Sequence, residues 1–65
     1  MKTRYDPEAD ALYVRFADSQ VVESEEVSPG IVLDFDADGK IVAIEFLGAA
    51  SRIAAEADLA HLRIA

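Results

Sequence analysis

Apolar and polar residues alternate over short stretches from the start of the chain to about residue 47. Leu12, Val14 and Phe16 share one side of such a stretch and polar neighbours occupy the other, which is the period of a half-buried β-strand. Residues 2–5 have strand length too, and residues 6–10 contain Asp, Pro and Glu, which favour a turn. We therefore expect these two strands to pair as a hairpin.

A weaker strand is predicted over residues 21–27, because polar and acidic residues interrupt its apolar pattern. Glu23, Glu25 and Glu26 give it the charge by which edge strands avoid pairing with other chains. Pro29-Gly30 suits the centre of a type II turn, since proline presets the first φ and glycine accepts a positive second φ. The chain is therefore expected to double back after an edge strand.

The best-specified element is a hairpin between residues 31–35 and 40–47, joined by Asp36-Ala37-Asp38-Gly39. Counting back from a type I turn places Phe35 opposite Ile41, Leu33 opposite Ala43 and Val32 opposite Ile44. Both faces of the sheet are then largely apolar. Such a sheet needs cover on both faces, and one short helix covers only one, so the pattern predicts a homodimer.

After Gly48 the composition changes to alanine, leucine, glutamate and arginine, which favour helix. Ser51 is the expected N-cap, and an apolar stripe at helical spacing predicts a helix over about residues 51–62. The fold class expected is α+β: a small, mainly antiparallel β-meander of four to five strands, within about residues 1–48, with one C-terminal helix. We expect residues 1–65 to form a single domain, and the role of residues 54–65, inside the core or reaching a neighbour, stays open.

Composition narrows the functional classes. The chain has 65 residues, no cysteine and a formal net charge of −7, and residues 23–38 contain acids but no base. Disulfides and thiolate metal sites are excluded, and the negative field opposes nucleic-acid binding. No apolar run approaches the roughly 18 residues of a membrane span, and residues 1–5 lead into polar sequence rather than a secretory signal. We expect a soluble cytoplasmic protein, with a small basic protein as a possible partner.

One segment matches the calcium-loop pattern D-x-[DN]-x-[DN]-G-x₅-E, from Asp34 through Asp36 and Asp38 to Glu45. A true loop lies between two helices and folds so that its last glutamate reaches the ion. Here strand-like alternation flanks the loop, and an extended segment carries Glu45 roughly 16 Å beyond Lys40. An acidic β-turn is therefore favoured, and the three aspartates remain only weak metal candidates.

No catalytic set is recognisable, and neither a catalytic residue nor a cofactor is predicted. His61 is the only histidine and has no cysteine or second histidine to complete a metal set, and no serine lies in a nucleophile elbow. Asp34 is the acid of most interest because it alternates with Leu33 and Phe35 on a central strand. A carboxylate that accepts structural hydrogen bonds is the favoured interpretation of this residue.

Two strings, residues 5–14 (YDPEADALYV) and residues 30–45 (GIVLDFDADGKIVAIE), resemble the small prokaryotic family catalogued as domain of unknown function 2283. The resemblance covers about residues 1–53. It implies a stand-alone domain of this length, with no assigned activity, substrate or cofactor, and bacterial genes beside small ribonuclease-toxin-like proteins. It also implies that the calcium-like spacing forms a hairpin.

Two functional hypotheses follow from different classes. The first is a non-enzymatic protein-interaction module, an antitoxin-like or regulatory partner of a small basic protein, which uses Glu23, Glu25 and Glu26 beside an exposed strand edge. The second is a small-ligand-binding or catalytic protein whose pocket forms at a homodimer interface. Calcium binding at residues 34–45 is a third, disfavoured alternative.

Overall fold

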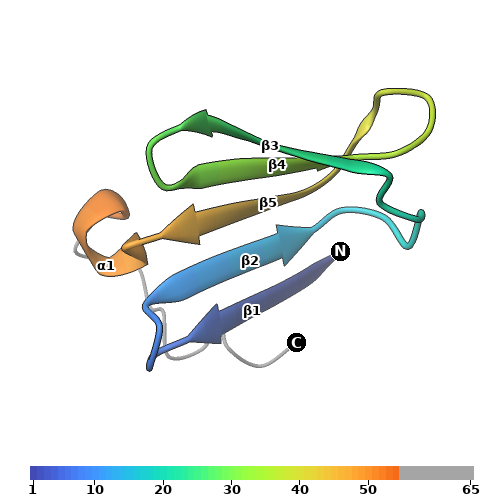
Figure 1. Cartoon of the computed structure of the whole chain (residues 1–65). Coiled ribbons are helices and arrows are strands. Elements are labelled where there is room, and N and C mark those ends of the chain that lie inside the picture. Colours follow the sequence, from blue (N-terminus) through green and yellow to red (C-terminus); the bar gives the residue numbers. More distant parts are fainter. Residues whose placement is uncertain (55–65) are drawn as a thin grey trace.

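The computed structural model describes residues 1–54. It shows five antiparallel strands in one sheet and one short helix that follows them (Figure 1). The elements are β1 (Lys2–Asp6), β2 (Ala11–Arg15), β3 (Glu23–Ser28), β4 (Ile31–Phe35), β5 (Ile41–Leu47) and α1 (Ala49–Arg52). The predicted α+β class, with a small antiparallel sheet and a helix after it, is confirmed.

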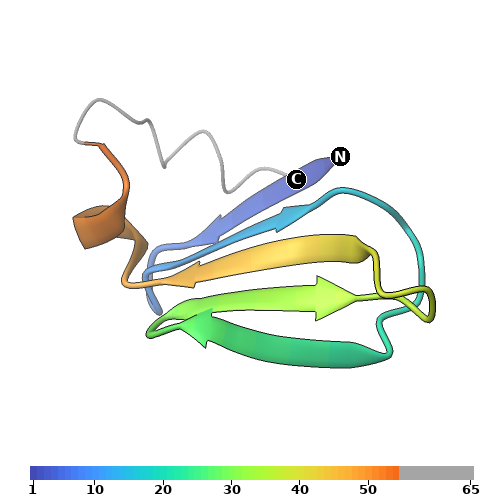
Figure 2. The same cartoon turned by 90° about the horizontal axis from the view of Figure 1, so that it is seen from above.

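The strands lie in the order β1-β2-β5-β4-β3. Two local units make up the sheet: the hairpin of β1 and β2, and the three consecutive strands β3, β4 and β5. Antiparallel pairing of β2 with β5 joins the two units. The connection over residues 16–22 crosses the ends of two strands and brings β3 to the far edge, while α1 lies at the opposite end of the sheet (Figure 2).

The two predicted turns that contain glycine form where the sequence placed them, as does the turn between β1 and β2. Pro29 and Gly30 are the two residues between β3 and β4, and Gly30 has a φ of 81°. In the second turn Gly39 has a φ of 77°, and its N–H donates to the carbonyl of Asp36 at 3.0 Å. These left-handed conformations suit glycine because it has no Cβ to clash with the backbone.

The hairpin of β4 and β5 differs from the prediction by one residue of register. Phe35 does lie opposite Ile41, but the pairing then shifts at a β-bulge, so that Leu33 lies opposite Ile44 rather than Ala43. The predicted pairing of Val32 with Ile44 is likewise wrong. A bulge sets two residues of one strand against one of its partner, and the turn sequence alone does not show it.

The bulge separates the side chains onto two chemically different faces, because directly opposite residues share a face. We call the first the apolar face; it includes Thr3, Tyr5, Leu12, Val14, Phe16, Ile31, Leu33, Phe35, Val42, Ile44 and Phe46. The other, the charged face, consists of Lys2, Arg4, Asp6, Ala11, Tyr13, Arg15, Val32, Asp34, Ala43, Glu45 and Leu47. The expectation that both faces are largely apolar is therefore wrong.

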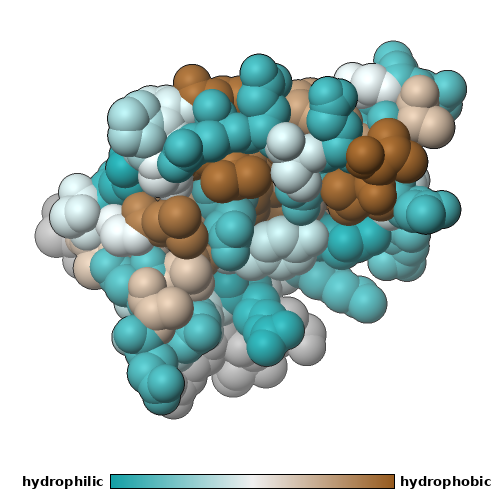
Figure 3. Space-filling view, viewed as in Figure 1, coloured by the Kyte–Doolittle hydropathy of each residue, from teal (hydrophilic) through white to brown (hydrophobic). Residues whose placement is uncertain are grey.

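The fully buried core is small. Its apolar members are Leu12, Val42, Ala43 and Ala49, and most of the apolar face is only half-buried. Seen from the side of Figure 1, hydrophobic residues form separate islands among hydrophilic ones (Figure 3). Only one face therefore calls for apolar cover, and the argument for a homodimer from two such faces fails.

The helix begins earlier than predicted. α1 spans Ala49–Arg52, and Gly48, with a φ of 67°, occupies the position before it. Ser51 is not the N-cap: it lies within the helix, and its hydroxyl donates back to the Gly48 carbonyl at 3.0 Å. The remainder of the predicted helix, and His61, fall outside the described residues.

Candidate functional site

Strand β3 is an edge of the sheet, as its charge predicted, and all six of its residues are exposed. It pairs only with β4, so the backbone N–H and C=O groups of every second residue point away from the sheet. Val22 before the strand and Val27 within it are exposed by 58% and 50%. The edge thus offers backbone hydrogen-bonding groups, apolar side chains and acids together.

The three acidic candidates of β3 do not share one face. Glu23 and Glu25 lie opposite Phe35 and Leu33, so they border the apolar face. Glu26 lies on the charged-face side, and its Oε2 accepts the N–H of Gly30 at 3.1 Å. Glu23 and Glu25 therefore form a pair beside the apolar face, and Glu26 helps to hold the turn that follows β3.

Asp34 has a structural partner on the edge strand. It is half-buried on β4, and its Oδ1 accepts the hydroxyl of Ser24 at 2.6 Å. The two residues lie directly opposite each other. The carboxylate thus stabilises the pairing of β3 with β4, as expected for a structural acid.

The acidic turn uses its first aspartate to hold the backbone. Oδ1 of Asp36 accepts the N–H groups of Asp38 and Lys40, each at 2.9 Å. Glu45 lies in the middle of β5, opposite Tyr13. Among residues 1–54, no three acidic or histidine side chains are grouped so that they could hold a metal ion.

Asp10 joins the N-terminal hairpin to α1. Its Oδ1 accepts the N–H of Ala50 at 3.0 Å, and its backbone carbonyl accepts the N–H of Ala49 at 2.9 Å. The same Oδ1 accepts the hydroxyl of Tyr5 at 2.6 Å. Asp10 has a φ of 52°, a left-handed conformation that aspartate tolerates better than most residues. A residue of the first turn thus caps a helix that begins 39 residues later.

The carboxylate of Asp10 shifts the pKa of the Tyr5 phenol. Its hydrogen bond to Asp10 raises the pKa of Tyr5 above its ordinary value of 10.0, and desolvation and the negative charges of Asp10 and Asp6 act in the same direction. The cause is direct, since the proton of the phenol makes the bond and the phenolate would face two anions. The protonated phenol is therefore the form that the fold favours.

Arg52 ties the end of α1 to two neighbouring segments. Its Nε donates to the Leu47 carbonyl at 2.8 Å, and its Nη2 donates to the Pro29 carbonyl. The φ of 81° at Gly30 favours glycine, and a Cβ there would also displace this guanidinium from its place beside the Pro29 carbonyl. Arg52 and Asp10 together fix the end of the sheet where α1 lies.

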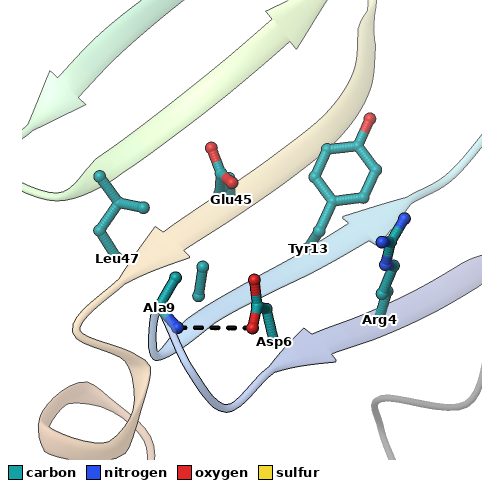
Figure 4. Close-up of a pocket in the computed structure, with 7 residues that line it drawn as sticks. Arg4, Asp6, Ala9, Tyr13, Glu45 and Leu47 are labelled. Carbon is teal, nitrogen blue, oxygen red and sulfur yellow. Dashed lines mark hydrogen bonds between the residues drawn. The ribbon is translucent and has the colours of Figure 1, made fainter.

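The charged face contains a hollow of about 440 Å³ at the same end of the sheet. Seven residues line it: Arg4, Asp6, Ala9, Ala11, Tyr13, Glu45 and Leu47. Figure 4 shows the labelled side chains rising on one side of β1, β2 and β5, with Arg4 and Glu45 on either side of Tyr13. The hollow is formed by residues of a single chain, whereas the sequence predicted a ligand pocket only at a homodimer interface.

Sequence reasoning missed Asp10 and the residues around the hollow. The positive φ of Asp10 has a weak sequence signal, since aspartate is one of the few residues that adopt it. The hollow depends on which residues face each other across β2 and β5, two strands from distant parts of the chain. The alternation within β2 does place Ala11 and Tyr13 on one face, but it does not identify the residues beside them.

The fold and its surfaces define a small single-sheet α+β protein with an acidic edge strand. Among the residues that the structure describes, no helix is long and apolar enough to cross a membrane. The family "Protein of unknown function (DUF2283)" matches residues 2–49, and the chain belongs to this family. The resemblance noted in the sequence is thereby confirmed. Comparison with curated proteins and with solved structures gives no match.

Proposed function

We propose that this protein is a non-enzymatic interaction module that binds a small basic protein along β3, in the manner of an antitoxin-like or regulatory partner. The observation that supports the proposal most directly is the edge strand, which is exposed along its whole length and carries Glu23 and Glu25. A strand of the partner would add to this edge through backbone hydrogen bonds, which give affinity.

Charge supplies the specificity. Lysines or arginines on the added strand would meet Glu23 and Glu25, and opposite charges directly across two strands favour the pairing. Because these acids border the apolar face, the aliphatic stems of such lysines or arginines would lie on the side of Leu33 and Phe35. The net charge of −7 adds long-range attraction for a basic partner and raises its association rate.

The test uses a photo-crosslinking residue in place of Ser28, at the end of β3, in cells of the native host. The expected result is one basic protein crosslinked in stoichiometric amount, and its loss from the double variant Glu23→Lys, Glu25→Lys. The matched control makes the same two acid-to-lysine changes away from β3, with Glu8→Lys and Asp18→Lys at exposed positions, and should leave the crosslink intact. No stoichiometric basic partner, or equal loss in the control, contradicts the proposal.

A homodimer through the apolar face is a separate proposal. Leu33, Ile44 and Phe46 are only half-buried there, and a second copy would remove them from water. Light scattering of the full chain should give twice the chain mass. Leu33→Glu should then produce monomers, while Val32→Glu, its neighbour on the charged face, should not. A full chain that is monomeric contradicts this proposal and leaves residues 54–65 as the candidate cover.

A further inference from the structure

The hollow on the charged face exists because two alanines, Ala9 and Ala11, lie among larger side chains. Ala11 is directly opposite Asp6 on β1 and Leu47 on β5, so these three residues form one row across the sheet. Ala9 in the adjoining turn lines the same space. The methyl groups of Ala9 and Ala11 are much shorter than the neighbouring side chains, which leaves the space of the hollow open between Asp6, Tyr13 and Leu47 (Figure 4).

The next row carries opposite charges at a defined separation. Arg4, Tyr13 and Glu45 lie opposite one another in register on β1, β2 and β5. Neighbouring strands place opposed Cα atoms about 4.5–5.5 Å apart, so those of Arg4 and Glu45 are separated by about 10 Å. The ring of Tyr13 stands between them. One wall of the hollow therefore presents a cation, an aromatic surface and an anion in sequence.

The groups around the hollow are positioned by the fold. Oδ1 of Asp6 accepts the N–H groups of Glu8 at 3.0 Å and Ala9 at 3.4 Å, which fixes the turn beside the hollow. The hydroxyl of Tyr13 accepts a hydrogen bond from Nη1 of Arg15 at 3.3 Å. Glu45 is half-buried in the central part of the sheet. Partial burial strengthens the interaction of its carboxylate with a cation relative to one in open solvent.

From this arrangement we infer that the hollow binds a small zwitterion with an apolar side chain, the chemistry of a free aliphatic amino acid. Its carboxylate pairs with the Arg4 guanidinium, which can donate two parallel hydrogen bonds. Its ammonium group pairs with Glu45, and its aliphatic part lies over Ala11 and against Leu47. A ligand that carries only an ammonium group leaves Arg4 without an anion of the ligand, and one that carries only a carboxylate leaves Glu45 unpaired and is repelled by Glu45 and Asp6.

The test is a titration of the full, isotopically labelled chain with L-leucine, followed by amide NMR shifts. Saturable shifts are expected at Ala9, Ala11, Tyr13 and Glu45, with a dissociation constant of about 1 mM, since the site is open on one side. The comparison ligands are 4-methylpentanoate, which lacks the ammonium group, and 3-methylbutylamine, which lacks the carboxylate. Each should bind at least about tenfold more weakly.

Two variants separate specific binding from general charge attraction. Glu45→Gln should weaken leucine binding about tenfold and leave the spectrum of the free protein dispersed, whereas Glu23→Gln, the same change on β3, should have no effect. Ala11→Leu should fill the hollow and abolish the shifts. The inference is overturned if shifts fail to saturate, if either single-charge ligand binds as well as leucine, or if Glu23→Gln weakens binding equally.

Discussion

Replacing Asp10 tests how the N-terminal hairpin is held to α1. Asp10→Ala removes the oxygen that accepts the N–H of Ala50, and the loss of such a cap costs about 1 kcal/mol. Alanine must also adopt the φ of 52° without a side-chain hydrogen bond, which adds up to about 1 kcal/mol. The Tyr5 hydroxyl loses its acceptor and turns to water. We expect the free energy of unfolding to fall by about 2 kcal/mol.

Two further substitutions of Asp10 separate the contribution of the lost helix cap from that of the left-handed backbone conformation. Asp10→Asn keeps a side-chain oxygen and tolerates the left-handed conformation, so its loss should stay below about 0.5 kcal/mol. Asp10→Gly removes the cap but relieves the backbone, so it should lose about 1 kcal/mol. Urea unfolding followed by circular dichroism measures all three. With a slope near 1 kcal/mol per molar urea, Asp10→Ala shifts the midpoint by about 2 M. Equal stability of the alanine and asparagine variants would refute the reasoning.

Three further predictions concern the contacts of Tyr5, Asp36 and Arg52. The fold stabilises the protonated phenol of Tyr5, so its contribution to stability is present below the unfolded pKa near 10 and is lost as pH rises through the raised folded pKa. In urea titrations the wild-type chain should therefore be more stable than Tyr5→Phe near pH 8, and this difference should shrink by about pH 11. Asp36→Ala should lower the free energy of unfolding by about 1–2 kcal/mol in thermal unfolding, because two backbone N–H groups lose their acceptor. Calorimetry should show calcium binding no tighter than millimolar both before and after this change. A submillimolar site that Asp36→Ala removes would restore the calcium-loop interpretation. Arg52→Lys should lower the free energy of unfolding in urea by about 1 kcal/mol, since one ammonium group cannot reproduce the bonds to the Leu47 and Pro29 carbonyls. An unchanged urea midpoint would contradict this role of Arg52.

Local sequence determined much of this fold. Pro29-Gly30 and the turn that ends at Gly39 each require a glycine with positive φ, and both formed where predicted. The clean alternation of residues 12–16 located β2, and the acids of residues 23–26 marked β3 as an edge. These features depend on interactions within a few residues, and a single sequence contains such information.

The features that were wrong or missed depend on contacts between distant segments. The bulge between β4 and β5 is an outcome of packing: shifting the register by one residue puts Leu33 opposite Ile44 and removes Glu45 from the apolar face. Alternation alone favours neither register. The cap of α1 comes from Asp10 rather than from the nearby Ser51, because the hairpin turn lies against the helix start. The hollow likewise requires the register of β2 against β5.

The order of the strands has a consequence for how the chain folds. β1 with β2, and β3 with β4 and β5, pair between segments that are adjacent in sequence, and such hairpins form in roughly 1–10 μs. Among the strand pairings within residues 1–54, only that of β2 with β5 joins segments about 30 residues apart, so it carries most of the loop-closure entropy of the sheet. We therefore expect the two locally paired units to dock last, along one line of hydrogen bonds. Residues 16–22 connect these units, and lengthening this connection should cost only about 0.6 kcal/mol for each doubling of the loop.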